Sequence, residues 1–184
     1  MTKIPLFTLA GLKTTVSPLG LLSLLTMIPL TGWLAAWLLA LPLSLAALAG
    51  VLSSFLMLVS EWLHQWGHAR AAQRVGYPMA GMHFFFIFSA SQYPPDEPEL
   101  PARVHIQRAL GGFWINVLIG ALLAPLAFWL WPQGGVLAWL AASLAVWNFF
   151  ILGLGALLPI DIPGVFTDDG GTLLRYWREW RAGK

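Results

Sequence analysis

Residues 43–75 read LSLAALAGVLSSFLMLVSEWLHQWGHARAAQRV, an apolar run that acquires ionisable side chains only in its second half. The run is long enough to cross a bilayer as a helix, which needs about 20 apolar residues. Ionisable groups inside a membrane are costly and are usually functional. On a helical wheel, Glu61, His64, Gln65 and His68 fall within an arc of about 100°. This stretch therefore predicts a spanning helix with one polar face.

His64 and His68 stand four residues apart, a spacing that allows two imidazoles on one helical face to bind one metal ion. In the His-Glu-x-x-His motif of zinc peptidases, the glutamate takes a proton from the attacking water. Gln65 occupies that position here, and a carboxamide cannot accept the proton. The pattern predicts a metal centre that lacks its usual proton acceptor. The competing interpretation is a polar seam that satisfies itself by hydrogen bonds between helices.

The chain as a whole has the composition of a membrane protein. Of its 184 residues, 58% are hydrophobic and 10% are charged, whereas soluble domains carry about 25% charged residues. The absence of cysteine excludes disulfides and thiolate metal ligands. The net charge of +2 is small and forms no basic face, so we expect no nucleic-acid partner.

Four apolar stretches qualify as spans, and we expect an α-helical polytopic membrane protein with one membrane domain over residues 1–184. The predicted spans cover about 19–41, 43–75, 106–131 and 136–158. Residues 82–88, between the second and third spans, are predicted to form a short strand or a re-entrant segment. Residues 170–184 are predicted to form an interfacial segment.

The Lys and Arg residues indicate the orientation in the membrane. All ten lie before the first span, around the central loop or after the fourth span. With four spans, these places share one side of the membrane. Because cationic residues collect in cytoplasmic loops, we expect both termini to be cytoplasmic, in an integral multi-pass protein of a prokaryotic cell membrane.

Two histidines do not complete a catalytic zinc site, which usually takes three protein ligands and a water. The inner ends of the second and fourth spans lie at the same membrane face, and Asp168-Asp169-Gly170-Gly171 follows the fourth span. An aspartate on this glycine-rich turn could fold back toward the histidines. Alternatively, Asp169 caps a short interfacial helix. Position alone leaves the two interpretations even.

Three motifs in order resemble the site-2 protease family of intramembrane zinc metalloproteases. Residues 64–69, HQWGHA, match the family's HExGHA pattern except at Gln65. Residues 112–116, GFWIN, match its GPxxN pattern without the proline. Residues 156–159, ALLP, match NLLP without the asparagine, and the Asp-Gly pair that follows comes later than usual.

The resemblance implies a site-2-protease-like core in which zinc is held by His64, His68 and Asp169. It also implies that Asn116 helps to position substrate or water. The late position of the Asp-Gly pair leaves Asp168 or, less readily, Asp161 as substitute ligands. The implied substrate is a transmembrane peptide or membrane protein, unwound locally and cut near the cytoplasmic face.

Gln65 admits three explanations. The chain is a pseudoprotease that binds metal or membrane substrates without cutting, or the glutamine was introduced to trap an inactive state, or another base acts. Glu61, one helical turn from His64, is the candidate base. Two other functions stay open: a non-catalytic membrane scaffold or regulator, and a carboxylate–histidine metal enzyme that uses Glu61.

Overall fold

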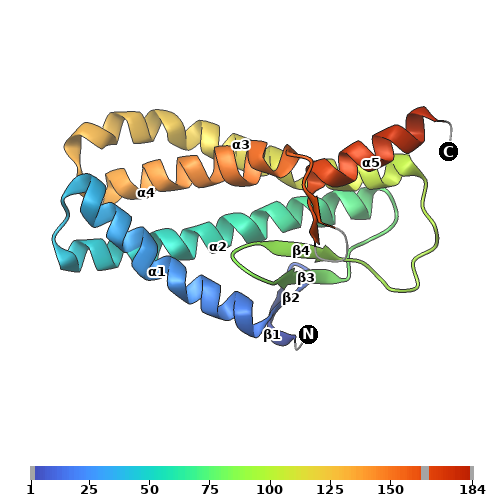
Figure 1. Cartoon of the computed structure of the whole chain (residues 1–184), viewed down its shortest axis with the longest axis horizontal. Coiled ribbons are helices and arrows are strands. Elements are labelled where there is room, and N and C mark those ends of the chain that lie inside the picture. The colour runs from blue at the N-terminus through green and yellow to red at the C-terminus, as the bar shows by residue number, and fades with distance from the viewer. Residues whose placement is uncertain (1–2, 163–165, 183–184) are drawn as a thin grey trace.

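The computed structural model describes residues 3–162 and 166–182, and a bundle of long helices dominates it (Figure 1). The helices are α1 (Pro18–Leu39), α2 (Leu43–Arg74), α3 (Ala102–Leu130) and α4 (Gly135–Val146), with α4 continued by the π-helical η2 (Trp147–Leu154) and the 3-10 turn η3 (Gly155–Leu157). Four helical stretches of the described chain are long and apolar enough to cross a membrane. The predicted four-span fold class is therefore confirmed. α2 lies at the centre and packs against α1, α3 and α4.

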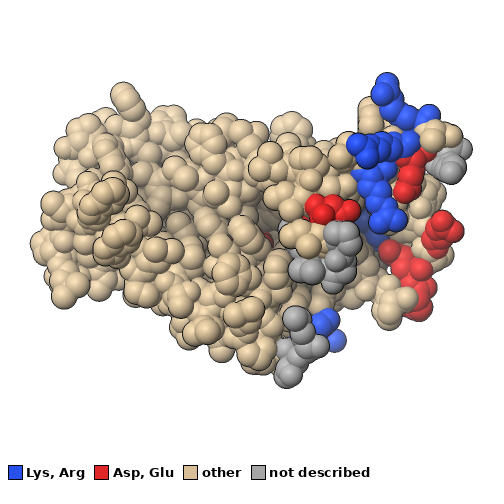
Figure 2. All heavy atoms as spheres, in the orientation of Figure 1, with Lys and Arg blue, Asp and Glu red and all other residues tan. Residues whose placement is uncertain are grey.

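The two ends of the bundle differ in their connections. At one end, α1 joins α2 through residues 40–42, and α3 joins α4 through the 3-10 turn η1 (Trp131–Gln133) and two glycines of positive φ, Gly134 and Gly135. The opposite end holds a sheet, a long loop, a C-terminal helix and both labelled termini (Figure 1). Figure 2 shows the charged side chains of this view gathered at that second end, while the rest of the face in view is uncharged. The uncharged length is the part that fits a bilayer.

The sheet has four strands in the order β1-β2-β3-β4. β3 (Gly81–Phe84) and β4 (Ser89–Gln92) run antiparallel, and residues 85–88 form the bend between them. The short β segment predicted between the second and third spans is therefore present. β4 is an edge strand, and it lies against α2.

β1 (Ile4–Leu9) and β2 (Leu12–Val16) form an N-terminal hairpin that the hydropathy analysis did not predict. Its turn is Ala10-Gly11, with positive φ at both residues, as two-residue hairpin turns of this kind require. β2 has alternating burial and pairs in parallel with β3. The alternation and the turn were the available sequence signals, but a hydropathy window long enough to find a membrane span averages over them.

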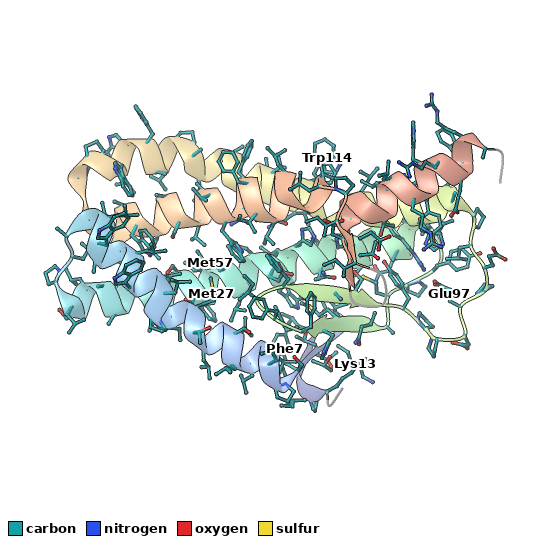
Figure 3. All side chains as sticks on the ribbon, in the orientation of Figure 1. Phe7, Lys13, Met27, Met57, Glu97 and Trp114 are labelled. Atoms are coloured by element: carbon teal, nitrogen blue, oxygen red, sulfur yellow. The ribbon has the colours of Figure 1, made fainter. Side chains whose placement is uncertain are left out.

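α2 and α3 approach each other closely near the middle of the polar half of the bundle. A Cβ atom on Gly67 would lie 2.4 Å from the carbonyl oxygen of Gly111, so only glycine allows this contact. Farther along, Met57 of α2 is buried with Met27 of α1 packed against its cluster, and Figure 3 shows the two side chains between these helices. The close approach brings one face of α2 within reach of side chains on α3.

After the fourth span the chain turns back through a small hairpin, β5 (Asp161–Ile162) and β6 (Phe166–Thr167), into α5 (Asp169–Arg181). α5 corresponds to the predicted interfacial segment 170–184, of which residues 183–184 lie outside the described residues. Gly170 packs directly on backbone carbonyls, since an added Cβ would lie 2.3 Å from the oxygens of Leu157 and Leu158. This contact fixes the first turn of α5 beside the end of the fourth span.

Candidate metal centre

The paired histidines of α2 point toward each other and away from lipid. Their Nε2 atoms lie 3.0 Å apart, and both residues are buried. Oδ2 of Asp169 lies 3.3 Å from Nε2 of His64 and 3.2 Å from Nε2 of His68. Three potential ligand atoms from two distant parts of the sequence thus form a nearly equilateral triangle.

The dimensions of this triangle fit a zinc ion. Zinc binds histidine nitrogen and carboxylate oxygen at about 2.0–2.2 Å in a tetrahedral arrangement, which places neighbouring ligand atoms about 3.3–3.5 Å apart. Gly112 of α3 faces the same place: a Cβ on it would lie 2.4 Å from Nε2 of His68 and 2.8 Å from Nε2 of His64. The missing side chain leaves space directly beside both nitrogens. The donor set and the space therefore both fit the ion.

α3 orients each imidazole through its other nitrogen. Nδ1 of His64 donates to Oδ1 of Asn116 at 2.9 Å, and Nδ1 of His68 donates to the backbone carbonyl of Arg108 at 2.8 Å. Both acceptors are carbonyl oxygens, which cannot donate, so each Nδ1 carries the proton. Each Nε2 is then free to bind a metal, an arrangement common among metal-bound histidines.

The aspartates near the fourth span have separate roles. Asp168 is the N-cap of α5, because its Oδ1 accepts hydrogen bonds from the backbone N–H groups of Gly171 (2.7 Å) and Ile160 (3.1 Å). Asp161 is exposed and accepts a 2.6 Å hydrogen bond from Thr167 Oγ1. The capping considered for Asp169 is thus done by its neighbour, and the next position along the helix places Asp169 against the histidines.

Asp169 is held in its ionised form. Burial on its own would raise the pKa of this carboxyl, but the positive charge of His68 and His64 when each carries a second proton on Nε2, and the hydrogen bonds from those Nε2 atoms, outweigh burial and hold the pKa well below its usual range. Metal ligands of this type must be deprotonated. The carboxylate is therefore ready to act as a ligand at neutral pH.

Gln65 points away from the triangle and toward β4. Its Nε2 donates to the backbone carbonyl of Ser89 at 3.3 Å, and its Oε1 accepts from the hydroxyl of Ser91 at 2.8 Å. Both ends of the amide are occupied. A carboxylate at this position could not donate to the Ser89 carbonyl.

Glu61 binds the same strand residue. Its Oε1 accepts hydrogen bonds from the backbone N–H (2.8 Å) and the hydroxyl (2.7 Å) of Ser89. Its Oε2 is buried and has no hydrogen-bond partner among the described residues. Glu61 does not belong to the cluster of potential metal ligands.

A cavity of about 300 Å³ opens beside these groups. Its lining includes polar residues of α2 and β4 and also apolar residues, among them Phe88, Ile151 and Leu152. Tyr93 and Arg108 also line it, with the guanidinium 4.0 Å from the ring centre of Tyr93. Burial raises the pKa of Tyr93 to about 12, so this side chain stays neutral. The cavity therefore combines hydrogen-bonding groups with apolar side chains.

Glu97 links the loop that follows β4 to Arg108 of α3. Its carboxylate binds the Arg108 guanidinium with one hydrogen bond of 2.9 Å and a second, shorter one. Figure 3 shows Glu97 in the loop at the charged end of the molecule. Arg108 also donates to the backbone carbonyl of Tyr77. One buried arginine thus ties both ends of the segment between α2 and α3 to the start of α3.

Sequence reasoning missed several residues that support the centre, including Asn148, Ser89, Ser91 and Arg108. Asn148 is fully buried in η2 and binds Asn116. An asparagine inside an apolar span is a signal in its own right, but it does not indicate a partner. The serines gave no signal, because their role depends on where β4 meets α2.

One solved structure is similar over almost the whole chain. It is the site-2 protease from Methanocaldococcus jannaschii, with a TM-score of 0.58 and 21% sequence identity, covering 98% of this chain and 73% of that one. This chain has a site-2-protease-like fold. The similarity confirms the predicted resemblance at the level of the fold. No family model matches the sequence, and no curated protein matches it significantly. A site-2-protease-like fold with four apolar helices belongs in a lipid bilayer, so the chain is a membrane protein.

Proposed function

We propose that this chain is a zinc-binding membrane protein with a centre of the site-2 protease type, and that it binds transmembrane peptide segments beside the ion. The ligands are His64, His68 and Asp169. The observation that carries this proposal is the triangle of ligand atoms, with edges of 3.0, 3.3 and 3.2 Å. Hydrogen bonds from each Nδ1 to a carbonyl oxygen on α3 support it, because in the neutral imidazoles they leave both Nε2 atoms unprotonated.

A peptide segment is the ligand that the cavity fits best. Backbone amides of an extended segment need hydrogen-bond partners when they leave the helix inside a membrane. The lining of the cavity offers polar groups on α2 and β4, and apolar side chains such as Phe88, Ile151 and Leu152 for contact with the side chains of a peptide. We further propose that the charged end faces the cytoplasm, because the Lys and Arg residues collect there.

We propose that the chain binds such segments without cutting them efficiently. Zinc, when bound, polarises a carbonyl and promotes ionisation of water. Hydrolysis also needs a proton acceptor, and Gln65 has both polar atoms committed to β4. Loss of general-base catalysis typically costs ~10²–10⁴ in rate. A pseudoprotease that retains substrate binding accounts for an intact ligand set together with Gln65.

One observation favours a second candidate, a protease that uses Glu61 as its base. Oε2 of Glu61 is buried without a hydrogen-bond partner among the described residues, and Glu61 lines the same cavity as the histidines. Ser89 holds the other oxygen and so fixes the carboxylate. An unpartnered carboxylate oxygen inside a membrane protein is expensive, and proton transfer would give it a function.

Metal analysis of the purified full-length chain tests the proposed centre. We expect one zinc per chain in the native sequence and none in His68→Ala or Asp169→Asn. His83→Ala is the matched control, because His83 is a buried histidine of β3 that bonds Thr15 and lies outside the ligand cluster. Zinc that survives loss of Asp169, or two metal ions per chain, would overturn the assignment.

Cleavage of a transmembrane peptide in reconstituted vesicles separates the two candidates. A pseudoprotease binds the peptide and cuts it only after Gln65→Glu. A protease with a displaced base cuts it in the native form and loses ~10²–10⁴ of its rate in Glu61→Gln. The carboxamide oxygen introduced by Glu61→Gln would still accept the Ser89 hydrogen bonds, so the strand contact is preserved in that variant.

A further inference from the structure

Asn148 lies at the second position of η2, and none of its surface is exposed. Its Nδ2 donates to the backbone carbonyl of Leu144 at 2.9 Å and to the hydroxyl of Ser60 at 3.0 Å. Its Oδ1 accepts from Nδ2 of Asn116 at 2.9 Å. Two buried amides, one from α3 and one from η2 within the fourth span, therefore bond to each other next to His64.

The backbone carbonyl fixes the direction of every hydrogen bond in this chain of contacts. The Leu144 oxygen can only accept, so the NH₂ group of Asn148 must face it and the Asn148 oxygen must face Asn116. Asn116 then has to present its own NH₂ group to Asn148. Its oxygen is left facing Nδ1 of His64, where it accepts at 2.9 Å.

The consequence reaches the metal-binding nitrogen. With an acceptor at Nδ1, the proton of a neutral His64 lies there and the lone pair of Nε2 points at the ligand triangle. A flipped Asn116 amide would present a donor to Nδ1 and move the proton to Nε2, where it would block the metal. We infer that Asn148 is a positioning residue that locks the Asn116 amide and thereby sets the tautomer of His64. This inference rests on the proposed metal centre.

Only His64 needs this lock, because the two histidines differ in the group that accepts the hydrogen bond from Nδ1. His68 donates to the backbone carbonyl of Arg108, and a carbonyl inside a helix cannot exchange oxygen for nitrogen. His64 instead relies on a side-chain amide, whose two ends have nearly the same shape. Ser60 contributes a second acceptor for Asn116 through its backbone carbonyl, but at 3.4 Å this contact is long. Asn148 makes the shorter bond.

Cobalt(II) titration of the full-length, metal-free protein in detergent tests the inference through affinity and the absorption spectrum of the bound ion. Asn148→Leu keeps the size of the side chain but removes the acceptor for Asn116, and we expect affinity to fall ~10–100-fold, as for loss of other outer partners of metal ligands. Asn148→Asp keeps an acceptor oxygen for Asn116 and, in the neutral form that burial favours, an O–H that can donate to the Leu144 carbonyl, so we expect affinity near the native value. Equal affinities for Asn148→Leu and the native chain, or a large loss in Asn148→Asp, would overturn the inference.

A double-mutant cycle separates positioning from packing. In Asn116→Asp, both carboxylate oxygens accept, so His64 finds an acceptor whichever way the group turns. Adding Asn148→Leu to that background should no longer weaken cobalt binding. A purely structural role for Asn148 predicts the same loss in both backgrounds, and that result would contradict the inference.

A measurement without metal distinguishes failure of the inference from failure of the proposed centre. Nitrogen-15 NMR of histidine-labelled, metal-free protein reports which ring nitrogen of His64 carries the proton, with the resonance assigned by comparison with His64→Ala. We expect the Nδ1-protonated fraction to fall in Asn148→Leu relative to the native chain and Asn148→Asp. If the native chain binds no metal but this shift occurs, the centre is wrong and the lock stands. If metal binds and the tautomer is unchanged, the lock is wrong.

Discussion

α2 has two polar surfaces, and they differ in how many polar atoms of their side chains are used in hydrogen bonds. Toward α3 and α5, His64 and His68 each use one nitrogen for a hydrogen bond and leave the other facing a shared centre. Toward β4, Gln65 uses both of its polar atoms and Glu61 uses one oxygen. The first surface keeps its donors available for a ligand, and the second holds a strand in place.

The contact between α2 and β4 gives a structural reason for a glutamine at position 65. Ser89 presents both a carbonyl and an N–H to α2, and an edge strand leaves such groups to be satisfied by something other than another strand. A carboxamide at position 65 and a carboxylate at position 61 match the carbonyl and the N–H respectively. The position that supplies the base in His-Glu-x-x-His sites is here an anchor for β4. The groups around position 65 are therefore complementary to a glutamine.

Gly112→Ala should have the largest effect, because it fills the space beside the two histidines and leaves the contact between α2 and β4 unchanged. The added Cβ would lie 2.4 Å from Nε2 of His68, in the space proposed for the metal. We expect zinc affinity to fall by more than ~100-fold, the upper end of what loss of an outer partner costs. Zinc content after dialysis against a competing chelator measures the loss.

Gly50→Ala is the matched control for that variant. It lies in the half of α2 away from the histidines, and its Cβ would lie 2.4 Å from the backbone carbonyl oxygen of Ile28 on α1. This change should lower the melting temperature while zinc stays bound at one per chain. If both variants lose zinc equally, the effect of Gly112→Ala comes from general helix packing and not from the metal site.

Gln65→Glu changes the second surface of α2, which contacts β4. The new carboxylate cannot donate to the carbonyl of Ser89, and it adds a negative charge beside Glu61. Leaving a buried acceptor unsatisfied costs ~1–3 kcal/mol, so we expect that loss in the free energy of unfolding, measured by chemical denaturation in detergent. Zinc affinity should change little.

Glu61→Gln combined with Gln65→Glu sharpens this test. The double variant has one carboxylate again, and the carboxamide oxygen at position 61 can still accept from Ser89. We expect it to recover part of the lost stability. A Gln65→Glu variant that is as stable as the native chain would show that β4 does not depend on the amide, and the proposed division between the two surfaces would fail.

Much of the fold was predictable from local patterns. Hydropathy gives the four spans, because each must cover the bilayer with apolar side chains. The i, i+4 spacing gives the paired histidines, because helical geometry alone places them together. α3 begins at Ala102, ahead of the predicted span of about 106–131, and its polar first turn packs through His105 on Tyr176 of α5. Hydropathy cannot detect a turn stabilised in that way.

The candidate site was predictable only in part, for a related reason. Asp169 could be proposed as a ligand, but its choice over Asp168 depends on which residue caps α5, and that is a tertiary outcome. Asn148 and Ser89 act through partners 32 and 28 residues away. No periodicity links such pairs, so the supporting contacts of the metal centre emerge only when the helices are packed.

Glu97→Gln should have the smallest effect, because it loosens the loop after β4 and leaves both surfaces of α2 intact. The hydrogen bonds from Arg108 lower the pKa of Glu97 below its ordinary value of 4.5. A carboxyl with a lowered folded-state pKa stabilises fully above its unfolded value and loses this contribution as the pH falls through the lowered one. We expect the native chain to be more stable than the variant by about 1 kcal/mol near neutral pH, converging with it as the pH falls through the lowered pKa of Glu97. Melting temperature against pH measures the convergence.

Glu179→Gln breaks the exposed Arg175–Glu179 pair and serves as control. We expect a change in stability below ~0.5 kcal/mol in that variant and no such convergence. If the two variants behave alike, the Arg108 contact with Glu97 is an ordinary surface ion pair and does not hold the loop.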